Sequence, residues 1–376
     1  VTLIKDAYFL YPKRDAEGVK ENLLLGTNTN GKEVRINGFE LDTNDPINGN
    51  EFEFNNTKPY VIYGYAGVPS GRTLNIQHGA RVYFHAESGI VVQPGASLNI
   101  NGQPSPDNHP QLNEVTFEGD RLEPLYEDVP GQWGTIWMRQ GSTSNIKHLT
   151  LKNATVGLLV ENCTLDIENS QIYNSANYGI LARGATMNNC KNLVVNLAGQ
   201  AALACSIGGS YDFRHCTFNN NWASSNQLAV LLSNYEEQAD GTNLTGALTQ
   251  ANFFNCIIYG SNNVEFFMDD INDGTPFVKD LRYCLFKFRD AGTSLSGKEA
   301  YDFIRDGETL GNGNLRNKNP NFFDANLNKL NISEDPDGGA FQKGSIDYII
   351  AADVLGHPRT SNPPDLGAYQ SVAFPE

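Results

Sequence analysis

Two adjacent carboxylates come closest to a catalytic arrangement in this sequence. Asp269 and Asp270 directly follow the strand-like segment 265–268. Hydrolysis of a glycosidic bond uses two carboxylates at a set separation. The pair is therefore a candidate catalytic site, and Glu236 is a third candidate from a distant segment. The ordinary alternative is a solvated acidic turn, which needs no substrate.

Polysaccharides are also commonly cleaved by β-elimination, a reaction that uses a base and often a cation. Arg183, which follows the segment 179–182, is the candidate base, although a lone arginine is usually a surface residue. Asp270, Asn272 and Asp273 are candidate ligands of calcium, and we expect no other cofactor. The calcium-loop pattern D-x-[DN]-x-[DN]-G needs one more residue between Asn272 and Asp273, so the match is incomplete.

Aromatic side chains beside polar ones could bind a sugar ring by stacking. Four aromatic residues are candidates for this role: Trp133, Trp137, Trp222 and Tyr235. Trp133 and Trp137 are four residues apart and lie beside a segment that interrupts the repeat described below. Their ordinary alternative is packing of that segment onto the core.

Several other chemistries find no support. No Cys-x-x-Cys occurs among the six cysteines, and no two histidines have the spacing of metal ligands. The Gly-x-Ser-x-Gly and Gly-Asp-Ser-Gly motifs of serine nucleophiles are absent. The net charge is −16, from 27 Lys and Arg against 43 Asp and Glu. We therefore expect no nucleic-acid partner. No segment reaches the roughly 18 apolar residues of a membrane helix, so we expect no membrane span.

A short pattern that recurs between about residues 110 and 290 must position these candidates. It reads apolar, two variable residues, a cysteine or another small or apolar residue, one variable residue, apolar. Its copies centre on Val115, Leu149, Ser170, Cys190, Cys216, Cys256 and Cys284. Most copies are 20 to 28 residues apart, and the larger gaps hold the insertions 118–141 and 233–246. Insertions of a repeat protein collect on its faces and often carry its binding surface.

The residue before each centre indicates a bend between two strands. It is Asn169, Asn189 or Asn255 in three copies, and Asn tolerates the left-handed conformation. His148, His215 and Tyr283 occupy the same place in three others. A third strand follows, so each turn of about 22 residues holds three short strands. The predicted fold is all-β, a single solenoid of the right-handed parallel β-helix type.

The cysteines then belong to one interior column, formed by Cys190, Cys216, Cys256 and Cys284 with Ser170 in line. We interpret them as small buried hydrophobes, and disulfides between adjacent rungs are the alternative. The 36 glycines and 44 asparagines suit such a turn-rich fold.

The ends of the chain divide into further segments. Residues 1–45 form a small β segment with a strand over 1–11 and a hairpin at Asn30-Gly31. Residues 46–110 are the N-terminal cap and first rungs, residues 111–290 the β-helix core, and residues 291–376 the C-terminal rungs and closing module.

Residues 60–180 resemble a family of secreted or surface β-helix proteins of Bacteroidetes with a pectin-lyase-like fold. The segments that carry the resemblance are 119–123, 130–136, 141–142 and 153–157. The tail from 319 to 369 resembles a C-terminal module of such proteins that ends in Pro-Asp-Leu-Gly-Ala-Tyr, here 364–369, although Gln370 stands where Glu is usual. Residues 1–45 resemble the last strands of an immunoglobulin-like domain. The resemblance implies an extracellular or outer-membrane location, with a lipid anchor in the precursor.

We therefore expect a secreted or surface-anchored bacterial protein that binds a polysaccharide or host glycan, or helps to process one, as a monomer and without a recognisable active site. One alternative is a divergent polysaccharide lyase or glycoside hydrolase, because the pectin-lyase-like fold includes both. A second alternative is a structural adhesin. Such a chain can be labelled immunoglobulin A protease-like from its β-helix, but this sequence has no protease motif.

Overall fold

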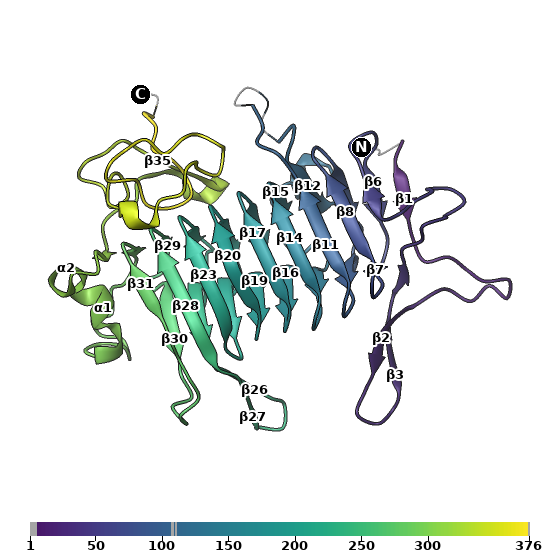
Figure 1. Cartoon of the computed structure of the whole chain (residues 1–376), viewed down its shortest axis with the longest axis horizontal. Coiled ribbons are helices and arrows are strands. Elements are labelled where there is room, and N and C mark those ends of the chain that lie inside the picture. Colours follow the sequence, from purple (N-terminus) through teal and green to yellow (C-terminus); the bar gives the residue numbers. More distant parts are fainter. Residues whose placement is uncertain (1–5, 107–108, 110, 375–376) are drawn as a thin grey trace. The chain divides into compact units, whose positions relative to one another are not determined.

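The computed structural model describes residues 6–106, 109 and 111–374 (Figure 1). The chain forms two compact units: Val1–Leu165 with Asn174–Ala176, and Asp166–Tyr173 with Asn177–Glu376. Each unit consists of short strands that pair in parallel with their equivalents one turn further along the chain. The prediction of an all-β parallel β-helix is thereby confirmed.

Three parallel sheets, A1, B1 and C1, make up the first unit. The strands of A1 are β1 (Tyr8–Leu10), β6 (Tyr60–Ile62), β9 (Arg81–Phe84), β12 (Val115–Gly119) and β15 (Leu149–Lys152). The strands of B1 are β4 (Gly38–Glu40), β7 (Tyr65–Val68), β10 (Gly89–Val92), β13 (Ile136–Met138) and β16 (Val156–Glu161). The strands of C1 are β5 (Glu53–Phe54), β8 (Thr73–Gln77), β11 (Ser97–Asn101) and β14 (Thr143–Lys147).

The second unit repeats this plan in sheets A2, B2 and C2. The strands of A2 are β21 (Val194–Ala198), β24 (Thr217–Asn220), β29 (Ile257–Gly260), β32 (Leu285–Phe286) and β33 (Leu315–Arg316). The strands of B2 are β19 (Tyr178–Arg183), β22 (Ala201–Ser206), β25 (Leu228–Ser233) and β30 (Phe266–Asp269). The strands of C2 are β20 (Thr186–Lys191), β23 (Gly209–Arg214), β28 (Leu248–Phe254) and β31 (Asp280–Arg282). The division between the units falls at β17 (Thr164–Glu168) and β18 (Gln171–Ser175).

Residues that alternate along each strand fill the interior of the solenoid. In the second unit Phe213 and Phe253 are 0% exposed and their ring centroids lie 4.9 Å apart. The ring of Phe218 meets that of Phe213 edge-on at 5.2 Å. Because every rung adds its aromatic and aliphatic side chains to the same columns, strands of only two to seven residues bury a continuous core.

The predicted left-handed bend occurs at one residue of each repeat. Positive φ angles are found at His148, Asn169, His215, Asn255 and Tyr283. The bends also form side-chain ladders, since Asn255 Nδ2 lies 3.0 Å from His215 Nε2. These residues are therefore structural, as predicted.

One copy of the repeat was placed wrongly. Its bend is at Asn192, with φ of 49°, and not at Asn189. Strand β20 holds one residue more than β23 after Met187, so that Cys190 pairs with Phe213. Leu193 instead takes the place in the column, because its carbonyl accepts the same backbone hydrogen bond, here from Thr217, that the carbonyl of Cys216 accepts from Ile257. Cys190 therefore lies outside the predicted cysteine column.

The disulfide alternative is wrong, because all six cysteines are free. Each is buried, and burial raises the pKa of Cys190, Cys216 and Cys284 well above that of an ordinary thiol. They act as small apolar side chains within the columns, as expected.

The N-terminal segment contributes directly to the first unit. The predicted strand over residues 1–11 is described from residue 6 onward, and its residues 8–10 form β1, which pairs in parallel with β6. The hairpin at Asn30-Gly31 is present as antiparallel β2 (Leu23–Thr27) and β3 (Glu33–Ile36). Strand β4 follows it and pairs in parallel with β7.

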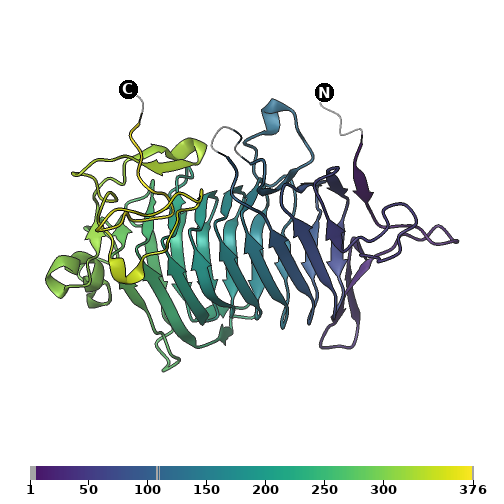
Figure 2. The ribbon, with the colours of Figure 1, turned by 45° about the horizontal axis from the view of Figure 1, so that its top comes forward.

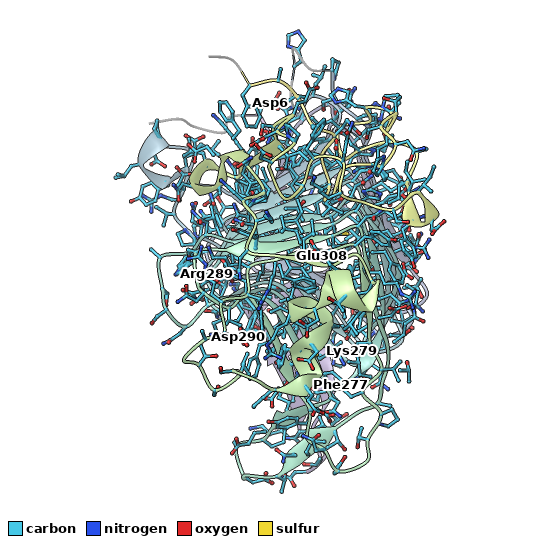
Figure 3. All side chains as sticks on the ribbon, turned by 90° about the vertical axis from the view of Figure 1, so that its left-hand side faces the viewer. Asp6, Phe277, Lys279, Arg289, Asp290 and Glu308 are labelled. Atoms are coloured by element: carbon cyan, nitrogen blue, oxygen red, sulfur yellow. The ribbon has the colours of Figure 1, made fainter. Side chains whose placement is uncertain are left out.

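The last rung of the second unit is closed by a short helical segment, seen from the end in Figure 3 with Asp290 and Glu308 labelled. It comprises a 3-10 turn (Glu299–Tyr301), α1 (Asp302–Arg305) and α2 (Gly307–Leu310). Leu295, Tyr301 and Ile304 are buried there. The hydroxyl of Tyr301 accepts a hydrogen bond from the backbone N–H of Met268, which covers part of the open edge of β30.

The C-terminal segment, which includes the hairpin β34 (Phe322–Asp324) and β35 (Lys329–Ile332), packs against the outside of sheet A2 (Figure 2). The Pro-Asp-Leu-Gly-Ala-Tyr motif makes this contact. Leu366 packs on Ile257 and Leu285, and a Cβ on Gly367 would lie 2.6 Å from Thr217 Oγ1. Gln370 Nε2 donates to the buried Asp365 carboxylate at 2.7 Å.

Candidate functional site

A pocket of about 340 Å³ lies in the first unit, at the corner where the chain passes from sheet A1 to sheet B1. Its lining comes from successive turns of the solenoid: residues 65, 86–87, 131–135 and 155–156. Residues 131–135 belong to the first of the two insertions into the repeat. The volume falls within the usual range of small-molecule sites.

Two glycines allow the wall of the pocket to form. A Cβ on Gly89 would lie 2.6 Å from the ring of Tyr65, and a Cβ on Gly134 would lie 2.0 Å from its hydroxyl oxygen. The Tyr65 side chain therefore lies directly against the backbone of the next two turns. Burial raises the pKa of Tyr65, and the nearby charge of Glu87 adds to the shift.

The polar groups of the pocket differ in whether they already have partners. Thr155 Oγ1 donates to the carbonyl of Trp133 at 2.9 Å. Thr135 is 8% exposed, and its hydroxyl finds no hydrogen-bond partner among the described residues. A buried hydroxyl without a partner is costly and calls for an explanation such as a bound group.

The two aromatic candidates of the first unit, Trp133 and Trp137, differ in burial. Trp133 is 1% exposed, its ring stacks on Phe84 at 4.2 Å, and its indole N–H donates to the carbonyl of Lys152. The prediction that Trp133 stacks on a sugar is therefore wrong, because no ring face is free. Trp137 faces outward from β13, is half-buried, and donates to Glu161 Oε2 at 2.5 Å.

In the second unit the structure brings four predicted residues together at the ends of the B2 strands. Arg183 makes two hydrogen bonds with Glu236, at 2.9 and 2.7 Å. Tyr235 donates to Asp269 Oδ2 at 2.9 Å, and this bond raises the pKa of Tyr235. These residues are spread over 87 positions of the sequence, from Arg183 to Asp269. They lie close together in space because β19, β22, β25 and β30 are neighbouring strands of one parallel sheet.

These pairs fix the second insertion and do not expose reactive groups. Tyr235 and Glu236 begin the hairpin of β26 (Tyr235–Glu237) and β27 (Asn243–Thr245). Their bonds to Asp269 and Arg183 attach the hairpin to strands on both of its sides. Because each carboxylate accepts a bond from a neighbouring side chain, the geometry favours an anchor over a catalytic pair.

The carboxylates of the acidic loop after β30 accept hydrogen bonds from nearby groups of the protein. Asp270 Oδ1 accepts from Asn234 Nδ2 at 2.9 Å and from the backbone N–H of Asn272. Asp273 Oδ1 accepts from the backbone N–H of Thr275. Across the described ranges, His, Cys, Asp and Glu residues do not gather in groups of three that could hold a metal ion. The ordinary alternative, an acidic turn, describes this arrangement.

Trp222 lies half-buried in the loop between β24 and β25, and its carbonyl accepts a hydrogen bond from the Ser261 hydroxyl at 3.0 Å. Ser261 in turn accepts from Gln227, which also bonds to a buried acid that the sequence did not single out. Glu265 is 0% exposed and accepts from Asn262 N at 2.6 Å and from Gln227 Nε2 at 3.2 Å. Its Oε2 and the Oε1 of Gln227 have no partner within the described part of the chain. Burial raises the pKa of Glu265 to about 8.

Residues of the pocket escaped sequence reasoning for an identifiable reason. Tyr65, Glu87 and Thr135 are separated by 22 and 48 positions and belong to no motif. The signal that could have found them is the set of glycines at corners beside an insertion, since glycine there lets a neighbouring side chain or ligand approach the backbone. His85 was also not predicted to pair, yet its Nδ1 lies 2.8 Å from Asp120 Oδ2.

Comparisons with protein families, with curated proteins and with solved structures found no match to this chain. In the part of the chain that the structure describes, no helix is long and apolar enough to cross a membrane.

Proposed function

We propose that this protein binds a glycan in the Tyr65 pocket, which we define as the pocket lined by residues 65, 86–87, 131–135 and 155–156, and that it acts there as a binding module. One observation carries the proposal: Thr135 belongs to the lining of a pocket of about 340 Å³, and its buried hydroxyl has no partner among the described residues. A sugar hydroxyl would supply the missing hydrogen bond, and the Tyr65 ring provides an apolar wall.

Binding is proposed in place of catalysis because of what the candidate catalytic groups do. Arg183 and Glu236 bond to each other, and Asp269 accepts from Tyr235, so these groups are engaged in holding a hairpin. The proposed location, outside the cell or on its surface, rests on the family resemblance of residues 60–180 and 319–369.

A Thr135→Val variant tests the proposal with little risk to folding. Valine has nearly the shape of threonine, and the hydroxyl that is lost makes no hydrogen bond within the described protein. We expect a melting temperature at or above that of the wild type, because a buried hydroxyl without a partner is removed, and a loss of glycan affinity of about 3- to 10-fold, as for one hydrogen bond. Affinity is measured by titration calorimetry with cellotriose, chitotriose, the chitosan trisaccharide and trigalacturonate.

Ser144→Ala is the matched control. Ser144 is 2% exposed in the same unit, and its hydroxyl also finds no partner in the described residues, but it does not line the pocket. The proposal is overturned if none of the four trisaccharides binds, or if Thr135→Val binds them as the wild type does. Shortening of a polysaccharide on size exclusion with light scattering would instead show an enzyme.

A further inference from the structure

The charge of the Tyr65 pocket bears on which sugars it can take. Glu87 is the one charged side chain in its lining, all of which the structure describes. Burial raises the pKa of Tyr65, and the charge of the nearby Glu87 carboxylate raises it further. The chain as a whole carries a net charge of −16, which adds to the negative potential.

The backbone at Glu87 is unusual for this residue type. Its φ is 57°, in the left-handed region that glycine and asparagine normally occupy. At other bends of the solenoid this conformation falls on Asn169 and Asn255. A glutamate here accepts a less favourable backbone conformation at an exposed position of the lining.

Several hydrogen-bond donors in the lining are already committed. The Gln132 amide donates to the carbonyls of Tyr126 at 2.6 Å and Val129 at 2.8 Å. The Thr155 hydroxyl donates to Trp133, and the backbone N–H of Thr135 donates to the Tyr65 oxygen. The Thr135 hydroxyl can donate or accept a bond, whereas the Glu87 carboxylate can only accept, so the one charge that the lining offers to a ligand is negative.

Basic side chains near the pocket do not neutralise the negative charge of Glu87, because they pair with other carboxylates. Lys152 pairs with Glu118 at 2.8 Å, and Arg121 lies 3.7 Å from Glu123. A uronate carboxylate is an acceptor only and needs Arg, Lys or a cation opposite it. The lining supplies no such charge, whereas hydroxyl and ammonium groups can donate to the oxygens that are present.

We infer that the Tyr65 pocket selects neutral or amino sugars and discriminates against uronic acids. This inference rests on the proposed function and names the ligand class of the same site. A pocket that disfavours uronic acids would not suit a polysaccharide lyase that acts on acidic polysaccharides, which was one alternative for the function of this chain.

The test compares three trisaccharides of similar size: chitosan trisaccharide (cationic), chitotriose (neutral) and trigalacturonate (anionic). Titration calorimetry at low and at high salt gives each affinity for the wild type and for Glu87→Gln. Glu87 is exposed, so the substitution is expected to leave the fold intact. Glu17→Gln, at an exposed carboxylate in the loop between β1 and β2, is the matched control.

We expect the wild type at low salt to bind trigalacturonate at least about fivefold more weakly than chitotriose, with the cationic sugar bound best. High salt and Glu87→Gln should each compress this order to within about twofold, and Glu17→Gln should leave it unchanged. Equal or tighter binding of trigalacturonate by the wild type overturns the inference while the proposed function stands. Failure of all three sugars to bind overturns the inference, and failure of cellotriose as well overturns the proposed function.

Discussion

The buried carboxyl of Glu265 gives a prediction whose magnitude follows from the structure. Glu265 is 0% exposed, and burial raises its pKa from 4.5 to about 8. The folded protein therefore keeps this proton at pH 7, whereas the unfolded chain releases it above pH 4.5. Each pH unit between these two values costs about 1.36 kcal/mol of folding free energy.

The sign of the effect follows from proton binding. Because the folded pKa is the higher one, the contribution of Glu265 to stability is greatest below pH 4.5 and is lost progressively as the pH rises through about 8. The difference of 8 − 4.5 gives a loss of about 5 kcal/mol above pH 8, and about 3 kcal/mol at pH 7, as orders of magnitude.

Glu265→Gln removes this titration. Glutamine keeps an acceptor for Asn262 N and Gln227 Nε2 and places an N–H donor where Oε2 has no partner. We expect the variant to be about as stable as the wild type near pH 4.5, and about 3 kcal/mol more stable at pH 7. Urea unfolding followed by tryptophan fluorescence between pH 4.5 and 9 measures the difference.

Glu299→Gln, at an exposed position of the 3-10 turn before α1, is the control, and its effect should stay within about 0.5 kcal/mol at every pH. Infrared difference spectra of the wild type minus Glu265→Gln should show a protonated carboxyl that persists to about pH 8. Parallel stability curves for the wild type and Glu265→Gln, with no such carboxyl, would refute the burial argument.

Two further predictions concern the core and the C-terminal segment. All six thiols are buried, so a thiol reagent such as Ellman's should modify fewer than one cysteine per chain until a denaturant is added; rapid reaction in the native protein would contradict the packing. Gly367→Ala places a Cβ 2.6 Å from Thr217 Oγ1 and 2.7 Å from Ile257 at a φ of 82°, so the variant should lose about 1–3 kcal/mol and expose the C-terminal segment to proteolysis. Wild-type melting and digestion of Gly367→Ala would argue against the role of the motif as the attachment point.

The repeat could be predicted from the sequence because its signals are local. A left-handed bend needs a residue that tolerates positive φ, and Asn169 and Asn255 supply it at a fixed distance from an apolar pattern. The same locality explains the error at Cys190. One extra residue in β20 leaves a plausible apolar pattern in place but shifts the bend to Asn192, and only the pairing with β23 shows the shift.

The candidate sites depended on contacts that a sequence pattern does not contain. Arg183, Glu236, Tyr235 and Asp269 were each identified by residue type. The pairing of Arg183 with Glu236, 53 positions apart, and of Tyr235 with Asp269, 34 positions apart, follows from the stacking of parallel strands. That pairing changed their interpretation from catalytic groups to an anchor. Trp133 changed in the same way, since its neighbour in the stack, Phe84, covers the ring face that a sugar would need.

Sequence alone therefore determined the solenoid and, apart from the copy at Cys190, its bends and its small interior residues, because each of these depends on the few residues of one repeat. Tertiary structure alone decided the pocket, the buried acid and the partners of every candidate. Their properties arise between rungs, where Tyr65 lies over Gly89 and Thr135 is left without a partner in the described protein. Burial and hydrogen bonding set the chemistry of a polar group, and both are properties of what the fold places around it.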